Sequence, residues 1–414
     1  MLDYKYNCSL QAENLIKILR RVSDAAARLP CVAVSIVDSA VLSFPLHPDS
    51  AGDYIIESLA QSFDCYAACT GKVVPSPNNS YPENVDVVEF SLCNLSMIIK
   101  ALSAMSGNIT ISFTYSVSSD NEAVCTSDCS FSDGRRFFSE RTSQPYQEVV
   151  NPKSLLNLST AAHYTGDADS LVKVLESVQF AASDAADSNA PYTGVLFRDN
   201  FVTCMNGAIL SRATLDFSIS NGQEFLFPAR FVHLLSNLDS GICNIYVDKK
   251  SVVFQSGDTL ISIQRISGRY VDASRLFDYS QYRSFTVRSE EFLSACKYLN
   301  IFKDRLKKLC VKDASGKSIP YATRLAMSGN TLSLYNPKHT VDSSVSFDAL
   351  NGEGFVLPEG VDAIGLDFKL FQQTIKHFQP NILIDLYYND YKTLVIFSTN
   401  NHSYEVLVMP MRLR

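Results

Sequence analysis

The sequence predicts an α+β protein of three repeated domains, each with two amphipathic helices packed on antiparallel strands. Three observations predict this fold class. A helix followed by a strand recurs, with Leu95, Phe231 and Phe371 at equivalent positions 136 and 140 residues apart. The 414 residues suffice for roughly three domains of about 150 residues each. With 46% hydrophobic residues, each domain can bury its own core. We place the domains at 1–147, 148–281 and 282–414.

The second helix of each domain gives the clearest repeat. Apolar residues spaced three or four apart form one stripe, as in a helix that buries a single face. The stripes are Leu92, Leu95, Ile99 and Leu102; then Pro228, Phe231, Leu235 and Leu238; then Phe368, Phe371, Ile375 and Phe378. A strand follows each helix, marked by Ile109 and Ile111, by Ile245 and Val247, and by Ile382 and Ile384.

An earlier helix with the same spacing belongs to each domain. Its stripes are Leu15, Ile18, Leu19 and Val22; then Leu171, Val174, Leu175 and Val178; then Phe292, Ala295, Cys296 and Leu299. Alternating segments predict the strands. These are 33–36, 85–90 and 108–115 in the first domain, 194–197, 201–205, 224–228 and 252–264 in the second, and 285–287, 325–327, 331–335, 343–347, 393–398 and 404–413 in the third. We expect polar loops at 75–84 and 312–319.

Antiparallel strands with helices on one side leave the other face of each sheet free. Domains of this kind joined end to end would form an arc, with sheets outside and helices inside. One chain would make part of a circle, and a head-to-tail dimer would close it.

Cationic residues are frequent on the predicted inward helix faces, although the net charge is −7. Such a lining suits contact with phosphate groups without reading bases. Each cation taken alone could equally be an ordinary solvated side chain. The candidates for DNA contact are Lys17, Arg20, Arg21, Arg28, Lys100, Lys173, Arg230, Lys297, Lys303, Arg305, Lys369 and Lys376, with Lys307 and Lys308 close by.

The patterns of an enzyme are missing, so we expect no catalytic residues and no cofactor. The six histidines are isolated from one another. Gly316-Lys317-Ser318 resembles the end of a phosphate-binding loop, but Val311 occupies the position that requires glycine. The pair Glu290-Glu291 lies at a helix start, where the helix dipole accounts for it.

The eleven cysteines mostly fall within apolar patterns and read as buried reduced thiols. Two pairs, Cys65 with Cys69 and Cys125 with Cys129, leave open a four-thiolate zinc site and with it a metal enzyme. Their spacing differs from that of usual zinc knuckles, so we predict no metal.

The chain has no apolar run near 18 residues, and its start carries Asp3 and Lys5 without an apolar signal core. We therefore expect a cytoplasmic protein, associated with the nucleoid if it binds DNA.

The C-terminal segment is the most distinctive stretch. Leu407 to Leu413 reads Leu-Val-Met-Pro-Met-Arg-Leu, with a proline inside an apolar run that predicts an edge strand or its exit. Exposed methionines there would form an adaptable apolar surface for partners. The other reading, a tail packed down to complete the last sheet, applies equally well to some of these residues.

With this tail and the three repeats, the chain resembles the bacterial DNA polymerase sliding clamp, the beta subunit of DNA polymerase III. That family characteristically ends in Val-Met-Pro-Met-Arg-Leu, here Val408 to Leu413. Further matches are Glu176–Phe180, Gly194–Phe197, Asn206-Gly207, Phe227-Pro228, Ser267–Tyr270 and the stretch with Tyr391, Thr393, Leu394 and Ile396, whereas domain one matches mainly through Leu15 to Ser23.

The resemblance implies three repeated DNA-clamp domains, with antiparallel sheets outside and two helices per domain lining a ring. It implies a head-to-tail homodimer that encircles duplex DNA and tethers the replicative DNA polymerase, after a clamp loader has opened it. Partners with short clamp-binding peptides would dock in a pocket between domains two and three. Carried over by position, that pocket comprises Tyr192, Met205, Gly207, Ala208, Ile209, Leu210, Val271, Arg275, Leu276, Tyr391, Thr393, Leu407, Val408, Met409, Pro410, Met411, Arg412 and Leu413.

The turn at 206–210 and position 271 depart from the family pattern. The family commonly has Asp-Gly-His-Arg-Leu where this chain has Asn206-Gly-Ala-Ile-Leu210, and Val271 replaces a usual proline. A more apolar pocket and a shifted peptide preference are expected. The predicted dimer interface contains Leu299, Ile301 and Phe302.

An alternative function is a clamp-like scaffold that encircles DNA for repair or another DNA transaction. It would keep the fold and the pocket but have different partners.

Overall fold

The computed structural model describes 3–26, 39–61, 65–77, 79, 87–93, 95–117, 125–142, 161–183, 190–219, 223–302, 322–335, 343–351, 357, 361–390 and 392–411. None of the helices in these ranges combines the length and the apolar character needed to cross a membrane.

The described chain forms two compact units. Unit one comprises Met1–Val172 and Phe231–Arg265, and unit two comprises Lys173–Arg230 and Ile266–Arg414. Unit one contains the predicted first domain and part of the second, and unit two contains the rest of the second and the third, so the unit boundaries do not test the repeat boundaries. The division at 1–147, 148–281 and 282–414 stays a prediction.

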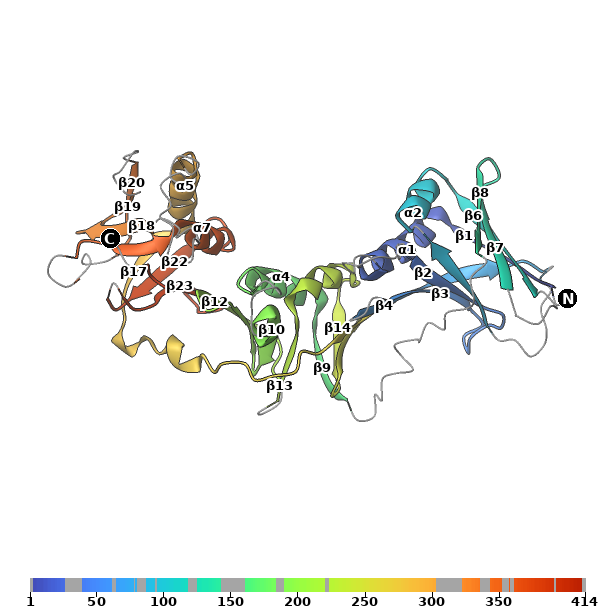
Figure 1. Cartoon of the computed structure of the whole chain (residues 1–414), viewed down its shortest axis with the longest axis horizontal. Coiled ribbons are helices and arrows are strands. Elements are labelled where there is room, and N and C mark those ends of the chain that lie inside the picture. The colour runs from blue at the N-terminus through green and yellow to red at the C-terminus, as the bar shows by residue number, and fades with distance from the viewer. Residues whose placement is uncertain are drawn as a thin grey trace, which may run out of the picture. The chain divides into compact units, whose positions relative to one another are not determined.

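Unit one is built on a twelve-stranded antiparallel sheet. Its main path runs β8-β7-β6-β1-β4-β16-β15-β14-β9, with β2, β3 and β5 branching from β4. The strands are β1 (Asp3–Gln11), β2 (Ser39–Pro45), β3 (Tyr54–Gln61), β4 (Cys65–Pro75), β5 (Val87–Cys93), β6 (Asn108–Val117), β7 (Cys125–Ser132), β8 (Phe137–Thr142), β9 (Ala162–Asp167), β14 (Ile242–Val247), β15 (Ser251–Ser256) and β16 (Thr259–Gln264). Helices α1 (Ala12–Ala26) and α2 (Leu95–Ser103) pack together, and α1 covers β2, β3 and β4 (Figure 1).

Unit two contains an eight-stranded antiparallel sheet in the order β13-β10-β11-β12-β24-β23-β22-β17 and a four-stranded sheet in the order β20-β19-β18-β21. The strands are β10 (Gly194–Arg198), β11 (Phe201–Met205), β12 (Ile209–Thr214), β13 (Glu224–Pro228), β17 (Arg283–Arg288), β18 (Ala322–Ser328), β19 (Thr331–Tyr335), β20 (Ser344–Asp348), β21 (Ile364–Asp367), β22 (Leu383–Tyr388), β23 (Val395–Thr399) and β24 (Tyr404–Val408). Helices α5 (Ser289–Asn300) and α7 (Phe368–Lys376) pack on each other.

Short 3-10 helices complete the chain: η1 (Ala190–Thr193), η3 (Ser274–Phe277) and η4 (Tyr279–Gln281). The chain passes from one unit to the other within α4 (Ala168–Gln179) and within the 3-10 helix η2 (Ala229–Asn237).

The predicted α+β class and antiparallel strands are confirmed, as are most helix stripes. Every stripe residue is buried in α1, in α5 and in α7 with its adjoining Phe378. The Asp367 side chain accepts hydrogen bonds from the backbone N–H groups of Lys369 and Leu370 at 2.8 and 3.2 Å, which caps α7.

Three stripes need correction. In α4, Leu171, Leu175 and Val178 are buried, but Val174 is only half-buried. In α2, Ile98 is buried and Ile99 only half-buried. In domain two the predicted α-helix is the 3-10 helix η2, and it buries Val232, Leu234 and Leu235. A 3-10 helix has three residues per turn, which shifts the buried face away from Phe231 and Leu238.

The strand predictions also need corrections. The segment 252–264 is a hairpin, β15 and β16, because Gly257 turns the chain at φ +52°. The predicted strand at 404–413 ends at Val408, and β24 lies inside the sheet, so Pro410 marks its exit. The strand predicted at 33–36 lies outside the described residues.

Phe371 tests the core beneath α7. Its ring is fully buried, with centroids 5.5 Å from Phe292 and 5.7 Å from Phe397. We expect Phe371→Ala to lower the free energy of unfolding by about 3–5 kcal/mol, because it leaves a cavity. Urea unfolding would measure the loss. Lys369→Ala on the exposed face of the same helix should change stability by less than about 0.5 kcal/mol, and equal effects of the two changes would contradict this core.

Candidate functional site

Strand pairing brings the C-terminal tail beside the turn at Asn206. Strands β12 and β24 are antiparallel neighbours, with Ile209 opposite Val408 and Leu210 opposite Leu407. The Met409 N–H extends the ladder by donating to the Ala208 carbonyl at 2.8 Å. Two segments about 200 residues apart in sequence thus lie side by side in the middle of the eight-stranded sheet of unit two.

The turn itself is fixed by its asparagine. The Asn206 Oδ1 atom accepts hydrogen bonds from the N–H groups of Ala208 and Ile209 at 3.0 and 3.1 Å. Gly207 has φ +87°, the left-handed region that favours glycine. An aspartate, which the resembled family commonly has at this position, could accept the same two hydrogen bonds, since either side chain offers the accepting oxygen.

An exposed apolar surface lies where these two segments leave the sheet, and we call it the docking surface. It comprises the exposed side chains of Val271, Leu276 and Met409, which are 46%, 39% and 46% accessible, together with half-buried Tyr192, Met205, Ala208, Pro410 and Met411. Large apolar side chains this exposed in one region are typical of a partner-binding site.

Two buried clusters support the docking surface. One contains Leu210, Ala273, Ile396 and Leu407, and the other Leu196, Leu226 and Tyr270. Met205 packs against both clusters, so they are continuous. Tyr192 meets Tyr270 edge-on, with ring centroids 5.9 Å apart.

Apart from Gly207 in the turn, the predicted pocket residues that are not part of the docking surface divide into three groups. Ile209, Leu210, Leu407 and Val408 are buried, so they can hold the surface from beneath but cannot contact a docked peptide. Thr393 is half-buried in a tight turn, where its N–H donates to Asp390 Oδ1 at 2.7 Å, and Arg275 is exposed. Tyr391, Arg412 and Leu413 lie outside the described residues.

Sequence reasoning missed the groups that fix the connecting segment 266–282 in place. This segment carries Val271, Arg275 and Leu276, and its Phe277 and Tyr279 contact a buried ion pair between Arg212 and Glu405. Glu405 stands inside the apolar run Tyr-Glu-Val-Leu-Val at 404–408, a signal from which a buried partner could have been inferred.

Most of the predicted DNA-contacting cations are exposed on helices or at their ends. In unit one these are Lys17 and Arg20 on α1 and Lys100 on α2, and Arg20 donates to Ser103 Oγ at 3.4 Å, linking the two helices. The others are Lys173, Arg230, Lys297, Lys369 and Lys376, while Arg28, Lys303 and Arg305 lie outside the described residues.

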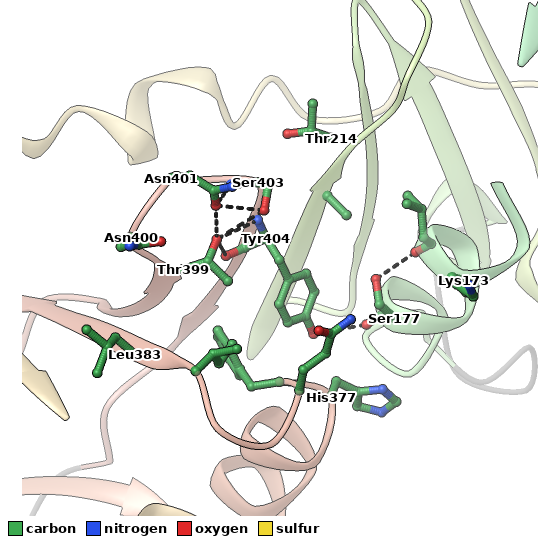
Figure 2. A pocket seen from close by; sticks show the side chains of 15 residues that line it. Lys173, Ser177, Thr214, His377, Leu383, Thr399, Asn400, Asn401, Ser403 and Tyr404 are labelled. Atoms are coloured by element: carbon green, nitrogen blue, oxygen red, sulfur yellow. Dashed lines mark hydrogen bonds between the residues drawn. The ribbon is translucent and has the colours of Figure 1, made fainter. Parts of the chain in front are cut away.

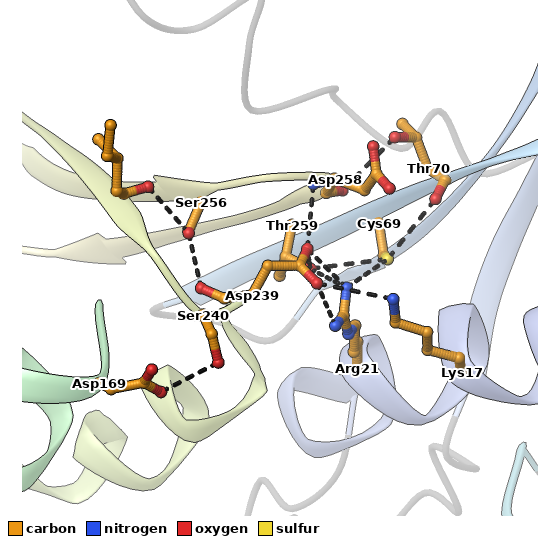
Figure 3. A network of polar contacts seen from close by, with 11 residues as sticks. Lys17, Arg21, Cys69, Thr70, Asp169, Asp239, Ser240, Ser256, Asp258 and Thr259 are labelled. Atoms are coloured by element: carbon orange, nitrogen blue, oxygen red, sulfur yellow. Dashed lines mark hydrogen bonds and ion pairs between the residues drawn. The ribbon is translucent and has the colours of Figure 1, made fainter. Parts of the chain in front are cut away.

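Arg21 is different, because its guanidinium is only 14% exposed and is paired with Asp239. Figure 3 shows the pair lying over β4 and β16, with Lys17 at 3.6 Å from the same carboxylate. Arg21 Nη1 donates to Asp239 Oδ2 at 2.7 Å and to Thr259 Oγ1 at 2.9 Å, and lies 3.9 Å from Cys69 Sγ. The Arg21 guanidinium is therefore used in contacts within unit one, and we remove Arg21 from the candidates for DNA contact.

A pocket of about 380 Å³ lies in unit two between α4, the end of α7 and the β23–β24 turn (Figure 2). Its lining includes Lys173, His377, Asn400 and Asn401 but no carboxylate. The Tyr404 hydroxyl donates to the Ser177 carbonyl at 3.0 Å, joining the pocket's two sides. Burial, and then the charge of Lys376, lower the pKa of His377, so its imidazole is neutral at pH 7.

His377 stacks on Phe180, with ring centroids 4.2 Å apart. This contact places the C-terminal ends of α4 and α7 next to each other. Lys173, in the middle of α4, lines the pocket, and Lys376 precedes the His377 that also lines it.

The cysteine pairs do not form a metal site in the described residues. Cys65 and Cys69 lie four positions apart on β4, about 13 Å along an extended strand, too far to share one zinc ion. Cys69 is buried against Arg21 and Thr259, and burial raises the pKa of its thiol. The side chain of Cys125 lies outside the described residues, which contain no group of ligands suited to a metal ion.

The three residues predicted for the dimer interface differ in exposure. Ile301 is 72% exposed just beyond α5, and Phe302 is half-buried with its ring 5.6 Å from Tyr298. Leu299 is fully buried in unit two, so it can only support this surface from within.

Comparison with solved structures confirms the fold that the resemblance implied. The DNA polymerase sliding clamp from Pseudomonas aeruginosa matches with a TM-score of 0.74 and 13% identity, over 99% of this chain and 100% of that one. The beta subunit from Streptococcus pyogenes gives 0.74 and 13%, over 98% and 100%. The DNA polymerase III beta subunit from Thermotoga maritima gives 0.70 and 15%, over 99% and 100%.

Sequence comparison alone finds no such relationship. No protein-family model matches the chain, and no curated protein does. The chain therefore keeps a sliding-clamp fold along its whole length at an identity too low for sequence matching to detect it.

Asp239 provides a pH-dependent test of the Arg21 network. Burial raises the pKa of Asp239, but hydrogen bonds and charge from Arg21, together with the Asp258 N–H and Lys17, outweigh it and lower the pKa overall. A lowered folded-state pKa stabilises the protein above the unfolded pKa, near 3.9, and that contribution disappears as the pH falls through the folded value.

We therefore expect Asp239→Asn to lower the free energy of unfolding by about 1–3 kcal/mol at pH 6. The gap to the unmodified protein should shrink as the pH falls below about 4, because the unfolded chain then binds a proton at Asp239 more readily than the folded protein does. Urea titrations between pH 3 and pH 7 would measure both values. Asp258→Asn serves as a charge-matched control, and a gap independent of pH would contradict the pairing.

Proposed function

We propose that this protein is a DNA sliding clamp: a ring-shaped homodimer that encircles duplex DNA and acts as the processivity factor of the replicative polymerase. The observation that carries the proposal is the full-length fold match to DNA polymerase III beta subunits, three of which span 98–99% of this chain. The docking surface on unit two, built around the Met409 tail, supports the same function. In this proposal the protein is a binding scaffold without catalytic activity, and it acts in the cytoplasm on the DNA of the nucleoid.

DNA would be held by enclosure more than by affinity. The protein is acidic overall, at −7, so a strong attraction to DNA is not built into its net charge. Exposed lysines and arginines on α1, α2, α4, α5 and α7 offer contacts to phosphate groups that carry no sequence information. Such contacts suit a clamp that must slide, because each one is weak and salt-sensitive.

Partners would dock through short apolar peptides on the docking surface. Val271, Leu276 and Met409 supply exposed apolar area, and the methionine adapts to different partner side chains. The replicative polymerase and the clamp loader are the expected partners, with the loader opening the ring. The Ala208-Ile209 pair makes the turn apolar, which favours partner peptides that rely on apolar residues.

The same substitution favours a second candidate function, a clamp that serves repair or another DNA transaction. With Ala208 and Ile209 in place of the histidine and arginine common in the family, the peptide preference would differ from that of a housekeeping clamp. The two candidates can be separated by whether this protein stimulates DNA synthesis by the replicative polymerase.

The decisive experiment combines loading with synthesis. Loaded with ATP and a cognate loader, the protein should stay on nicked circular DNA through gel filtration and leave after the circle is cut. Primer extension by the cognate replicative polymerase should then yield products of kilobase length. Retention without stimulation would favour the second candidate, and no retention would refute a clamp.

The docking surface can be tested separately from the ring. We expect Leu276→Ala with Met409→Ala to reduce long-product synthesis at least tenfold, because apolar anchor residues contribute about 2 kcal/mol or more each at interfaces. Retention on circular DNA should be unchanged. Ile242→Ala, at an apolar side chain 69% exposed in unit one, is the matched control. Full synthesis by the double variant would place docking elsewhere.

The dimer can be tested at Ile301. We expect Ile301→Asp to yield monomers in sedimentation velocity, because an unpaired carboxylate is costly in an apolar interface. Ile242→Asp introduces the same charge at a comparably exposed position and should leave the dimer intact. A dimer that persists in the Ile301 variant would rule out this seam.

A further inference from the structure

Glu405 is a fully buried carboxylate near the start of β24. Directly across the ladder stands Arg212 on β12, the Cα partner of Glu405. Arg212 Nε donates to Glu405 Oε2 at 2.8 Å, and the Nη2 group donates to the same oxygen. The arginine side chain is itself only 16% exposed. This is an ion pair removed from water, in a position where a sheet interior would ordinarily hold an apolar residue.

The second carboxylate oxygen faces the connecting segment. Glu405 Oε1 accepts a hydrogen bond from the Tyr279 hydroxyl and lies 3.2 Å from His402 Nδ1. Burial, then the hydrogen bond and charge of Glu405, raise the pKa of Tyr279. The tyrosine therefore remains a donor throughout the neutral range, and both carboxylate oxygens are satisfied.

The arginine holds the same segment through its flat face. The Arg212 guanidinium carbon lies 3.3 Å from the ring centroid of Phe277 and 4.5 Å from that of Phe201. A guanidinium over an aromatic ring is attracted by the ring's negative face, and more strongly when water is excluded. One buried ion pair thus grips two side chains of the segment, Phe277 and Tyr279.

Phe277, Tyr279 and Tyr282 also pack against the buried cluster of Leu210, Ala273, Ile396 and Leu407, so the ion pair adds directional contacts to apolar packing that is only partial. Neither η3 nor η4 contains a buried residue. Between the buried Ala273 and the anchored Phe277 lie Arg275 and Leu276, both exposed. The position of Leu276 on the docking surface is therefore set from behind, by residues that a docked partner could not reach.

We propose that the Arg212–Glu405 pair is a positioning element for partner docking, fixing residues 274–281 so that Leu276 and Met409 present one surface. The proposal rests on the proposed function, because its effect would be measured as partner binding to the docking surface. Glu405, Arg212 and Tyr279 are positioning residues and touch no partner. The polymerase would bind weakly without them because the segment must be ordered on binding.

The test uses Tyr279→Phe and Glu405→Gln in the full-length protein. Tyr387→Phe is the matched control, since Tyr387 lies in the same cluster, 4.4 Å ring to ring from Tyr279, and makes no described hydrogen bond to Glu405. Amide hydrogen exchange over 274–281 should rise at least tenfold in the two test variants and not in the control. The dissociation constant of the cognate replicative polymerase should rise about tenfold in parallel.

A third variant separates positioning from stability. Arg212→Met with Glu405→Met replaces the pair by apolar side chains, a change that often preserves or raises stability. Its urea midpoint should recover relative to Glu405→Gln, whereas fast exchange over 274–281 and weak polymerase binding should persist, because Tyr279 still lacks its acceptor.

Exchange over 274–281 that stays slow in Tyr279→Phe and Glu405→Gln would overturn the proposal, whatever the polymerase does. Fast exchange with unchanged polymerase binding would overturn it as well. If the unmodified protein bound no polymerase, the proposed function would be contradicted instead. The hydrogen-exchange data would still show whether the Arg212–Glu405 pair fixes residues 274–281.

Discussion

The antiparallel pairing of β12 with β24 is the contact on which the rest of unit two depends. It joins residues 209–214 to residues 404–408 and fixes their register through backbone hydrogen bonds. Side chains alternate across a strand, so a slip of one residue would turn every side chain to the opposite face. Such a slip would separate Arg212 from Glu405 and bury Met409. The docking surface and the anchor behind it are consequences of one register.

Unit one uses a similar device at the ladder between β4 and β16. There Arg21 reaches Cys69 and Thr259, which are themselves opposite each other in the ladder, and pairs with Asp239. In both units a guanidinium with little exposure ties a ladder between distant strands to a neighbouring segment. Buried ion pairs contribute little net stability compared with apolar packing, but breaking one is costly. They favour one arrangement over its alternatives, which would suit joints between the predicted domains.

The sequence predicted the helices well because their cores follow a local period. Leu15, Ile18 and Phe371 are buried where a 3.6-residue repeat requires. The buried residues of η2 were predicted wrongly because a 3-10 helix has a different period. The hairpin at 252–264 was predicted as one strand because Gly257 lies within a long, mostly apolar segment. The partners of Arg21 and Glu405 could not be predicted, since Asp239 and Arg212 are 218 and 193 residues away. Local patterns carry no information about such pairs.

The altered turn shifts the origin of specificity in the proposed clamp. Ile209 faces the core and Ala208 offers only a methyl group, so the turn presents no charge to a partner. The connecting segment carries Arg269, Asp272, Arg275 and Asp278, and Asp272 is held by Arg198 at 3.4 Å. Of these, Arg275 directly precedes Leu276 of the docking surface and would contribute to any charge preference toward a partner peptide. A side chain discriminates between partners best when its backbone has a fixed position. Arg275 lies two residues before Phe277, which packs against the Arg212 guanidinium.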